Sequence, residues 1–255
     1  MKYNSLLKNK SKIVPVFFAC DDKFVPYMMV TMKSLIDNTS SKRIYKIHVL
    51  HADISIKNQG LVKTLETDNC KIEFNNVSEK LEQIEKQITL RDYYSATTYY
   101  RLFIADMFPE YNKAVYIDSD TIVLQDIAKF ADYDLEDNYI GAIRDQLVAQ
   151  TDIYGDYVEK VLGVSREAYF NAGVVLINCK QFRKKNIQKQ FVDFLNTYRF
   201  VVAQDQDYLN ILCKNKVLWI DGKWNVQMIG TPSCAEKDFA LIHYNLAAKR
   251  VQISY

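Results

Sequence analysis

The chain has 255 residues, of which 49% are hydrophobic, enough to bury the core of one large domain or two small ones. Its 33 Lys and Arg residues nearly balance its 31 Asp and Glu residues, leaving a formal net charge of +2. This balance gives no general field that would attract nucleic acid or an anionic membrane, so we expect no nucleic-acid partner. Any anionic ligand must be bound by local groups.

The cysteines and the amino-terminal segment indicate the compartment. None of the five cysteines forms a C-x-x-C pair, which favours a reducing environment. The apolar run Ile13–Cys20 is too short for a signal-peptide core with its cleavage site, or for a membrane span. We therefore expect a cytoplasmic protein without a transmembrane segment, and leave open a peripheral contact with the inner membrane face.

The few glycines exclude two common nucleotide sites. The chain has seven, and none lies in G-x-G-x-x-G or in a phosphate-binding loop that ends in Gly-Lys-Ser/Thr. The sequence therefore argues against an ordinary dinucleotide-binding site and against a P-loop nucleotide site. Any phosphate must be bound by other groups.

The first part of the chain alternates strand and helix patterns. Its predicted elements are a strand over Ile13–Cys20, a helix over Phe24–Leu35, a strand over Ile44–Leu50, a helix over Ile56–Leu65 and a strand over Cys70–Phe74. Two further strands follow at Ala114–Ile117 and Tyr139–Ile143. This alternation predicts an α/β fold with a doubly wound, mainly parallel sheet.

The pattern changes after residue 145. A polar, tyrosine-rich stretch over 146–169 reads as a mobile or acceptor-facing insertion, and it precedes a strand over Ala172–Asn178. Helices are predicted over Ile187–Tyr198 and Gln204–Leu212, and the apolar run Phe239–Ile242 ends at His243. Since no Pro-, Gly- or Ser-rich linker divides the chain, we expect one domain over 1–255.

Three acidic residues follow predicted strands. Asp21 follows the first strand, Asp118 follows Ala114–Ile117, and Asp145 lies just beyond Tyr139–Ile143. Doubly wound sheets bind their ligands beyond the carboxyl ends of their strands, so these residues suggest a single polar site. Asp145, beside the insertion, is the best candidate for an acceptor contact, although a turn residue is the simpler interpretation.

Asp118 and Asp120 flank Ser119 immediately after an apolar strand. Alternate residues of an extended chain point the same way, so the two carboxylates converge in the geometry that suits a hard divalent cation. An acidic pair in a solvated loop is the competing interpretation. His243 could complete an Asp, Asp, His set, which favours Mn²⁺ over Mg²⁺ because nitrogen ligands suit the softer ion. The competing reading of His243 is a histidine hydrogen-bonded at a sheet edge.

Six motifs now resemble a known family in their order along the chain. They are Ala19-Cys20-Asp21-Asp22, Thr97-Thr98-Tyr99-Tyr100-Arg101-Leu102, Val115-Tyr116-Ile117-Asp118-Ser119-Asp120, Tyr169-Phe170-Asn171-Ala172-Gly173-Val174, Gln204-Asp205-Gln206-Asp207-Tyr208-Leu209-Asn210 and His243-Tyr244. Over residues 13–250 the chain resembles the family 8 retaining glycosyltransferases, which include bacterial lipopolysaccharide galactosyl- and glucosyltransferases and, more distantly, glycogenin.

The resemblance implies a fold and an activity. The fold is the A-type glycosyltransferase fold, a Rossmann-like doubly wound sheet in a single domain. Residues 13–145 would form the nucleotide-sugar-binding half and residues 146–255 the acceptor-side half. The activity is transfer of a hexose from UDP-glucose or UDP-galactose to a glycan or lipid-linked saccharide, with retention of configuration, using Mn²⁺ or alternatively Mg²⁺.

The resemblance also assigns roles to individual residues. Asp118, Asp120 and His243 would hold the metal. Gln206, Asp205 and Arg101 would act at the reacting sugar. The donor-binding set would be Ala19, Asp21, Lys23, Arg101, Asp118, Ser119, Asn171, Ala172, Gly173, Asp205, Gln206 and Lys249, with Asn171-Ala172-Gly173 as a turn along the hexose.

Two positions depart from the family pattern. Lys23 stands where bacterial members often carry a small polar residue, and Leu246 replaces a glycine between His243 and Lys249. The bulk of leucine there puts in doubt how closely the backbone approaches the diphosphate.

Two other functions stay open from the sequence. A sugar nucleotidyltransferase also places paired acids on a metal, but it usually has a Gly-rich basic segment near the first strand, where this chain has Cys20-Asp21-Asp22-Lys23-Phe24. A non-catalytic sugar-nucleotide-binding protein is the second alternative, and Leu246 is its main cue. For the enzyme, Gln206 is an amide and a poor nucleophile, which favours front-side attack over a covalent intermediate.

Overall fold

The computed structural model describes residues 12–79, 96–198, 200, 203–228, 231–232 and 234–245. A seven-stranded sheet crosses it in the order β3-β2-β1-β4-β7-β6-β8. The strands are β1 (Ile13–Ala19), β2 (Ile44–His51), β3 (Cys70–Asn76), β4 (Ala114–Ile117), β6 (Ile140–Arg144), β7 (Phe170–Ile177) and β8 (Val217–Trp219). A smaller sheet, in the order β5-β10-β9, consists of β5 (Thr121–Val123), β9 (Val226–Gln227) and β10 (Leu241–His243).

The main sheet is mostly parallel, as predicted. Strands β3, β2, β1 and β4 pair in parallel, and so do β6 and β8. Only β7 runs against its neighbours, antiparallel to both β4 and β6. The chain moves outward from β1 to β3 and then returns to place β4 on the other side of β1. Strand order therefore reverses between β1 and β4.

Helices cover both faces of this sheet. The α-helices are α2 (Val25–Asp37), α3 (Ile56–Lys63), α5 (Ala96–Tyr99), α6 (Ile104–Met107), α7 (Ala128–Ala131), α8 (Gln146–Gln150), α9 (Asp152–Lys160), α10 (Cys179–Lys184), α11 (Ile187–Thr197) and α12 (Asp205–Leu212). The 3₁₀ helices are η1 (Asp22–Phe24), η3 (Tyr100–Phe103), η4 (Arg166–Ala168), η5 (Gly222–Trp224) and η6 (Glu236–Asp238). None of the helices in these described ranges combines the length and apolarity that a membrane span requires.

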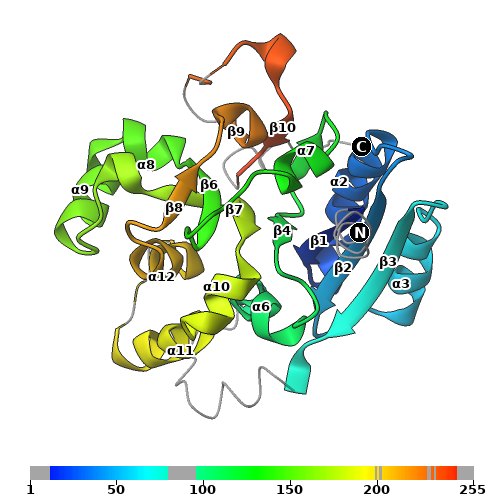
Figure 1. Ribbon diagram of the computed structural model, residues 1–255, viewed down its shortest axis with the longest axis horizontal. Helices are drawn as coiled ribbons and strands as arrows, with labels where there is room; N and C mark the ends of the chain where they lie inside the picture. Colours follow the sequence, from blue (N-terminus) through cyan, green and yellow to red (C-terminus); the bar gives the residue numbers. More distant parts are fainter. Residues whose placement is uncertain are drawn as a thin grey trace, which may run out of the picture.

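Strand β1 shows why the sheet needs cover on both sides. Val16 and Phe18 pack into the apolar cluster that also holds α2, whereas Phe17 and Ala19 pack into the cluster that holds η3, α11 and α12. Side chains of a strand alternate between faces, so a strand that is apolar throughout must be buried on both. Figure 1 shows α2 and α3 beside β1–β3, and α10, α11 and α12 together by β7.

The stretch over 146–169 is not an unstructured insertion. It folds as α8, α9 and η4, with an apolar cluster of its own around Val148, Val158 and Tyr169. Arg166 ties η4 to α9 through ion pairs with Asp156 and Glu159. Figure 1 shows α8 and α9 side by side at the edge of the molecule next to β6. The polar composition reflects an exposed outer face of these helices.

Candidate active site

The site lies where strand order reverses. Asp21 comes two residues after β1 ends, and Asp118 directly follows β4, the strand beside it. The carboxyl ends of these parallel strands meet at one edge of the sheet, and a reversal point there leaves a crevice. The topology thus accounts for the meeting of two acidic residues that lie far apart in the sequence.

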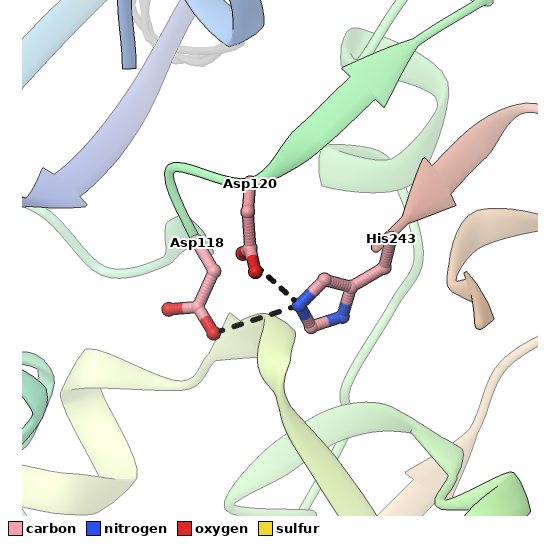
Figure 2. Close-up of side chains that lie close together, drawn as sticks. All are labelled: Asp118, Asp120 and His243. Atoms are coloured by element: carbon pink, nitrogen blue, oxygen red, sulfur yellow. Dashed lines mark ion pairs between the residues drawn. The ribbon is translucent and has the colours of Figure 1, made fainter. Parts of the chain in front are cut away.

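The small sheet brings His243 to the same edge. Strand β10 pairs antiparallel with β5, and its register sets His243 opposite Thr121, the residue after Asp120. The backbone N–H of Tyr244 donates to the Asp120 carbonyl at 3.0 Å. Figure 2 shows the imidazole directed at both carboxylates, with Nε2 3.3 Å from Asp120 Oδ1 and 3.8 Å from Asp118 Oδ2.

These three side chains fit a divalent cation. One ligand atom from each of Asp118, Asp120 and His243 lies within 4.8 Å of the others. An ion that holds its ligands at about 2.1 Å brings opposite ligand atoms within about 4.2 Å of each other, so only small side-chain movements are needed. A set of two carboxylates and one imidazole suits Mn²⁺ better than Mg²⁺.

Gly173 lets these side chains come together. A Cβ atom at this position would lie 2.3 Å from His243 Cε1 and 2.6 Å from Asp118 Oδ2. Both distances are far inside van der Waals contact, so any side chain here would push His243 and Asp118 away from each other. The absence of a side chain at Gly173 therefore keeps open the space between the histidine and the aspartate.

The other oxygen of Asp118 is held by the protein. Oδ1 accepts from the Tyr116 hydroxyl at 2.9 Å and from Arg101 Nη2 at 3.2 Å. The Arg101 guanidinium also lies over the Tyr116 ring, 4.3 Å from its centroid. Burial raises the pKa of Tyr116 well above its ordinary value, so the hydroxyl stays a donor. These contacts turn Oδ2 of Asp118 toward His243.

Arg101 links Asp118 to Asp205. Its Nε lies 2.9 Å from Asp205 Oδ2, but the Nε–H bond donates to the Thr98 carbonyl, so the contact with Asp205 is an ion pair without a hydrogen bond. Burial alone would lower the pKa of Arg101, and the carboxylates of Asp118 and Asp205 reverse this and raise it. Burial raises the pKa of Asp205 to about 6, against the opposing effect of Arg101.

The segment Asn171-Ala172-Gly173 is not a turn, contrary to the sequence-based expectation. It lies inside β7, where the pairing with β6 jumps from Val175 opposite Ala142 to Asn171 opposite Ile143. Such an irregularity lets one strand carry extra residues, which here bulge toward the site. The Ala172 carbonyl accepts from Arg101 Nη1, and the Gly173 carbonyl accepts from the Asp118 N–H at 2.7 Å.

A hydrogen-bonded group of amides extends from this bulge. Gln206, in the first turn of α12, accepts from the Ala172 N–H at 2.9 Å and donates to Asp145 Oδ2 at 3.0 Å. Asn171 donates to the same Asp145 oxygen at 3.0 Å. Asp145 also accepts from the Val148 N–H and so caps α8. It is therefore more than a turn residue, and it joins β6, β7 and α12 at one point.

Two adjoining cavities meet at Arg101 and Asp118. The first, about 370 Å³, is bounded by Ala19, Asp21, Ser119 and the metal-binding group. The second, about 430 Å³, is bounded by Asp145, Asn171, Asp205 and Gln206 on one side and by tyrosines of α9 on the other. The site thus has two compartments with Asp118 at their junction.

Most of the predicted donor-site residues border these cavities, but not all. Lys23 is exposed in η1 and lines neither cavity, whereas its neighbour Phe24 lines the first. Lys249 and Leu246 lie outside the described residues. The Ser119 hydroxyl donates toward the Ala19 carbonyl at 3.4 Å, which joins the ends of β1 and β4.

Sequence reasoning missed several residues that shape the site. Tyr116 read as an ordinary strand residue, and Asn225 follows Trp224 in a stretch with no periodic pattern. Asp207 belongs to the predicted motif of residues 204–210, but its surroundings were not predicted: it is fully buried and accepts hydrogen bonds from the hydroxyls of Tyr157 and Tyr169. The motif does not indicate these two partners, because they come from distant parts of the chain.

Comparison with known proteins gives a consistent result. A protein of Haemophilus influenzae named as a glycosyltransferase is 32% identical over 218 residues, which are 84% of this chain and 64% of that protein. The lipopolysaccharide 1,3-galactosyltransferase of Salmonella typhimurium is 30% identical over 138 residues, which are 51% of this chain and 40% of that enzyme. The matched parts are less than two thirds of the length of either relative.

Solved structures show the same fold. Galactosyltransferase LgtC in complex with donor and acceptor sugar analogs superposes with a TM-score of 0.71 at 26% identity, over 91% of this chain and 87% of that one. The bifunctional glycosyltransferase WbbM superposes with a TM-score of 0.79 at 26% identity, over 91% of this chain and 46% of that one. These likenesses confirm the A-type glycosyltransferase fold.

The profile of glycosyl transferase family 8 matches residues 15–250, which include every element of the two sheets except the first two residues of β1. The predicted resemblance is thereby confirmed: this chain belongs to glycosyl transferase family 8.

Proposed function

We propose that the protein is a metal-dependent retaining glycosyltransferase that moves glucose or galactose from a UDP-sugar to a saccharide acceptor, either a glycan or a lipid-linked saccharide. One observation carries the proposal. Asp118, Asp120 and His243 converge on the wall of the cavity beside Asp21, and Asp118 also borders the adjoining cavity beside Gln206. A site that must hold a nucleotide diphosphate and a sugar on opposite sides of one scissile bond needs this arrangement.

Asp118, Asp120 and His243 would hold the metal, which we propose to be Mn²⁺, with Mg²⁺ as the alternative. When bound, the ion would neutralise negative charge that develops on the leaving diphosphate. Asp118 would keep its place during the reaction because Tyr116 and Arg101 hold its second oxygen.

We assign the first cavity to the nucleotide and the second to the sugar and acceptor. Ala19, Asp21 and Ser119 would contact the nucleotide, and Lys249 would face a phosphate oxygen. In the second cavity Arg101, Asp205, Asn171 and Gln206 offer the polar groups that bind sugar hydroxyls. Asp145 accepts hydrogen bonds from the amides of Asn171 and Gln206, and the acceptor would enter between it and α9.

Retention of configuration is proposed to occur by front-side attack. The Gln206 carbonyl oxygen already accepts from the Ala172 N–H, and both oxygens of Asp207 accept from tyrosines, so neither is a free nucleophile. The acceptor hydroxyl would form its bond to the anomeric carbon as the bond to phosphate breaks, and its proton would pass to the departing phosphate. A glycosyl-enzyme trapped on Asp205 or Asp207 would contradict this mechanism.

The test is release of UDP from UDP-glucose or UDP-galactose in the presence of Mn²⁺, measured with and without a panel of saccharide acceptors. We expect release that needs the metal and that falls by at least ~100-fold in Asp120→Ala, since the substitution removes one ligand of the group that stabilises the leaving diphosphate. Mass spectrometry of the products identifies the transferred hexose.

Each alternative gives a different result. A sugar nucleotidyltransferase would form a nucleotide-sugar from a sugar phosphate and a nucleoside triphosphate, and would not release UDP on addition of an acceptor. A non-catalytic binding protein would bind the UDP-sugar without turnover. If wild-type protein binds UDP-sugar and Mn²⁺ but no acceptor or water supports release, the enzyme proposal is wrong.

A further inference from the structure

Asn225 lies between His243 of the proposed metal site and Asn171, one of the hydrogen-bonded side chains that line the second cavity. It follows η5 and precedes β9, and its side chain is completely buried. Its Oδ1 lies 3.0 Å from His243 Nδ1, and its Nδ2 donates to Asn171 Oδ1 at 2.9 Å. Through these two hydrogen bonds the buried side chain of Asn225 connects His243 with Asn171, which lie far apart in the sequence.

The direction of these hydrogen bonds is fixed by the backbone. The Gly173 N–H can only donate, and it donates to Asn171 Oδ1 at 3.0 Å. That atom must therefore be the carbonyl oxygen of Asn171, and the Asn225 atom beside it must be the NH₂ group. The carboxylate of Asp145, which accepts from the other end of the Asn171 amide, gives the same orientation.

The same logic extends to the imidazole. Because the NH₂ group of Asn225 faces Asn171, its carbonyl oxygen faces His243. A carbonyl oxygen can only accept, so Nδ1 of His243 must carry the proton. Nε2, the nitrogen directed at Asp118 and Asp120, is then left with a free lone pair.

We propose that Asn225 is a positioning residue, which holds His243 in the tautomer that ligates the metal and joins the metal site to the sugar cavity through Asn171. This inference rests on the proposed function. Groups behind a metal ligand set its tautomer and ring orientation, and their loss commonly weakens metal binding by about 10–100-fold. Here the group behind the ligand continues through Asn171 to Asp145 and on to Gln206.

The connection has a consequence for the reaction. Gln206 and Asn171 share one oxygen of Asp145, so a shift of Asn171 disturbs the amide that borders the reacting sugar. Loss of the Asn225 to Asn171 bond alone should therefore lower turnover, even where the bond to His243 is kept. Two substitutions at position 225 can separate these two effects.

The first test needs no substitution at position 225. Histidine ¹⁵N–¹H spectra of metal-free wild-type protein, at a pH where the imidazole is neutral, report which ring nitrogen carries the proton. We expect the Nδ1–H tautomer for His243, assigned by comparison with His243→Gln. Observation of the Nε2–H tautomer would overturn the inference, whatever the variants do.

The second test measures Mn²⁺ affinity by isothermal titration calorimetry. We expect Asn225→Ala to bind Mn²⁺ about 10–100-fold more weakly than wild type. Asn225→Asp keeps an acceptor for His243 and loses the donor to Asn171, so it should retain Mn²⁺ affinity within a few-fold and show a lower kcat. Asn178→Ala is the matched control: Asn178 is also buried and hydrogen-bonded on both sides of its amide, but it caps α10, away from the site.

The outcomes separate the inference from the proposed function. If wild type releases UDP and binds Mn²⁺, but Asn225→Ala binds Mn²⁺ equally well, the inference fails and the function stands. If Asn225→Asp loses as much affinity as Asn225→Ala, the acceptor role of Asn225 is wrong. If wild type binds no Mn²⁺, both fail. If Asn225→Ala does not fold, the tautomer spectra of wild type and the Mn²⁺ affinity of Asn225→Asp still test the inference.

Discussion

Gly173 of strand β7 lies against the side chains of His243 and Asp118. We predict that Gly173→Ala lowers Mn²⁺ affinity at least ~10-fold, because a methyl group there overlaps His243 Cε1 and Asp118 Oδ2 and forces both side chains aside. Calorimetric titration of Mn²⁺ checks this, and the free energy of unfolding of the metal-free protein should fall by roughly 1–3 kcal/mol from overpacking.

Gly60 provides the control. It lies on the exposed side of α3, and a Cβ atom there meets nothing within 4 Å. Gly60→Ala should therefore leave Mn²⁺ affinity unchanged and raise the free energy of unfolding by about 0.5–1 kcal/mol, the usual gain for alanine over glycine in a helix. Equal Mn²⁺ affinities for the two variants would show that Gly173 does not limit the site.

The raised pKa of Asp205 predicts that the free energy of unfolding of the metal-free protein depends on pH. Burial raises its pKa from 3.8 to about 6, so the folded state binds its proton more tightly than the unfolded state does. The stability that this proton contributes is fully present below pH 3.8 and is lost as the pH rises through about 6. Over that interval the loss amounts to roughly 3 kcal/mol at most.

The measurement is urea unfolding at a series of pH values with a chelator present, for wild type and for Asp205→Asn. Asparagine does not titrate, so the difference in the free energy of unfolding, wild type minus variant, should decrease from pH 4 to pH 6.5. The variant also loses the ion pair with Arg101, which changes this difference in the free energy of unfolding by a constant amount. That loss does not make the difference decrease as the pH rises. A difference that stays level or rises with pH contradicts the raised pKa.

The residues that could be predicted are those that follow apolar strands. Asp21, Asp118 and His243 each follow a run of apolar residues, and the rule that ligands bind at strand ends places them together. Asn225 could not be found in this way, because its role depends on contacts with His243 and Asn171, which only the folded chain brings near. Lys23 was expected at the nucleotide, yet it points to solvent from η1.

At the scale of elements, Asp207 of α12 joins α9 and Tyr169, the residue between η4 and β7. Its carboxylate accepts from the Tyr157 hydroxyl at 2.8 Å, the Tyr169 hydroxyl at 2.6 Å and the Ala203 N–H at 3.1 Å. Burial raises the pKa of Asp207, and the two tyrosine hydroxyls oppose that rise. Because α12 carries Asp205 and Gln206, this contact holds α9 in place relative to two other residues that line the second cavity.

We predict that Tyr157→Phe destabilises the protein by about 1–3 kcal/mol, since a buried carboxyl group loses one of its donors. The same change should raise the KM for the acceptor more than the KM for the donor, because Tyr157 borders only the second cavity. Urea unfolding and steady-state kinetics check the two effects.

Tyr27→Phe is the control, since Tyr27 lies 56% exposed on α2 and lines neither cavity. Its stability should stay within about 0.5 kcal/mol of wild type. A Tyr157→Phe variant with wild-type stability and unchanged kinetics would show that Asp207 does not need this donor.

The strands and α-helices from β1 to β3 could be predicted closely, whereas α5, α6, β5, α7 and the elements of 146–169 could not. Strand β1 is apolar on both faces, and α2 repeats buried residues at Met28, Met32 and Leu35. In contrast, α8 has five residues and α9 has nine, and each has only two buried residues. Helices this short are marginal on their own, and their stability comes from tertiary contacts such as those of Arg166.

For the whole molecule, the metal-binding residues join parts of the chain that are far apart. Asp118 and Asp120 lie between β4 of the main sheet and β5 of the small sheet, and His243 ends β10. The apolar cluster on that face contains side chains of both sheets, Val115 and Ile117 from β4 and Val123 and Leu241 from β5 and β10. Separation of the small sheet from the main one would therefore destroy the metal site.

This geometry predicts that Mn²⁺ stabilises the entire fold. An ion that binds only the folded state at 100 times its Kd adds about 2.7 kcal/mol to the free energy of unfolding, which for a chain of this size raises Tm by roughly 5–10 °C. Differential scanning calorimetry with Mn²⁺ and then with a chelator measures the shift, and Mg²⁺ at equal concentration should give a smaller one because His243 favours the softer ion. Asp120→Asn and His243→Ala should abolish the shift, whereas Asp68→Asn, at an exposed position away from the site, should keep it. A Tm shift of the same size in His243→Ala would mean that the ion binds elsewhere, because the imidazole is the one ligand in this group that β10 supplies.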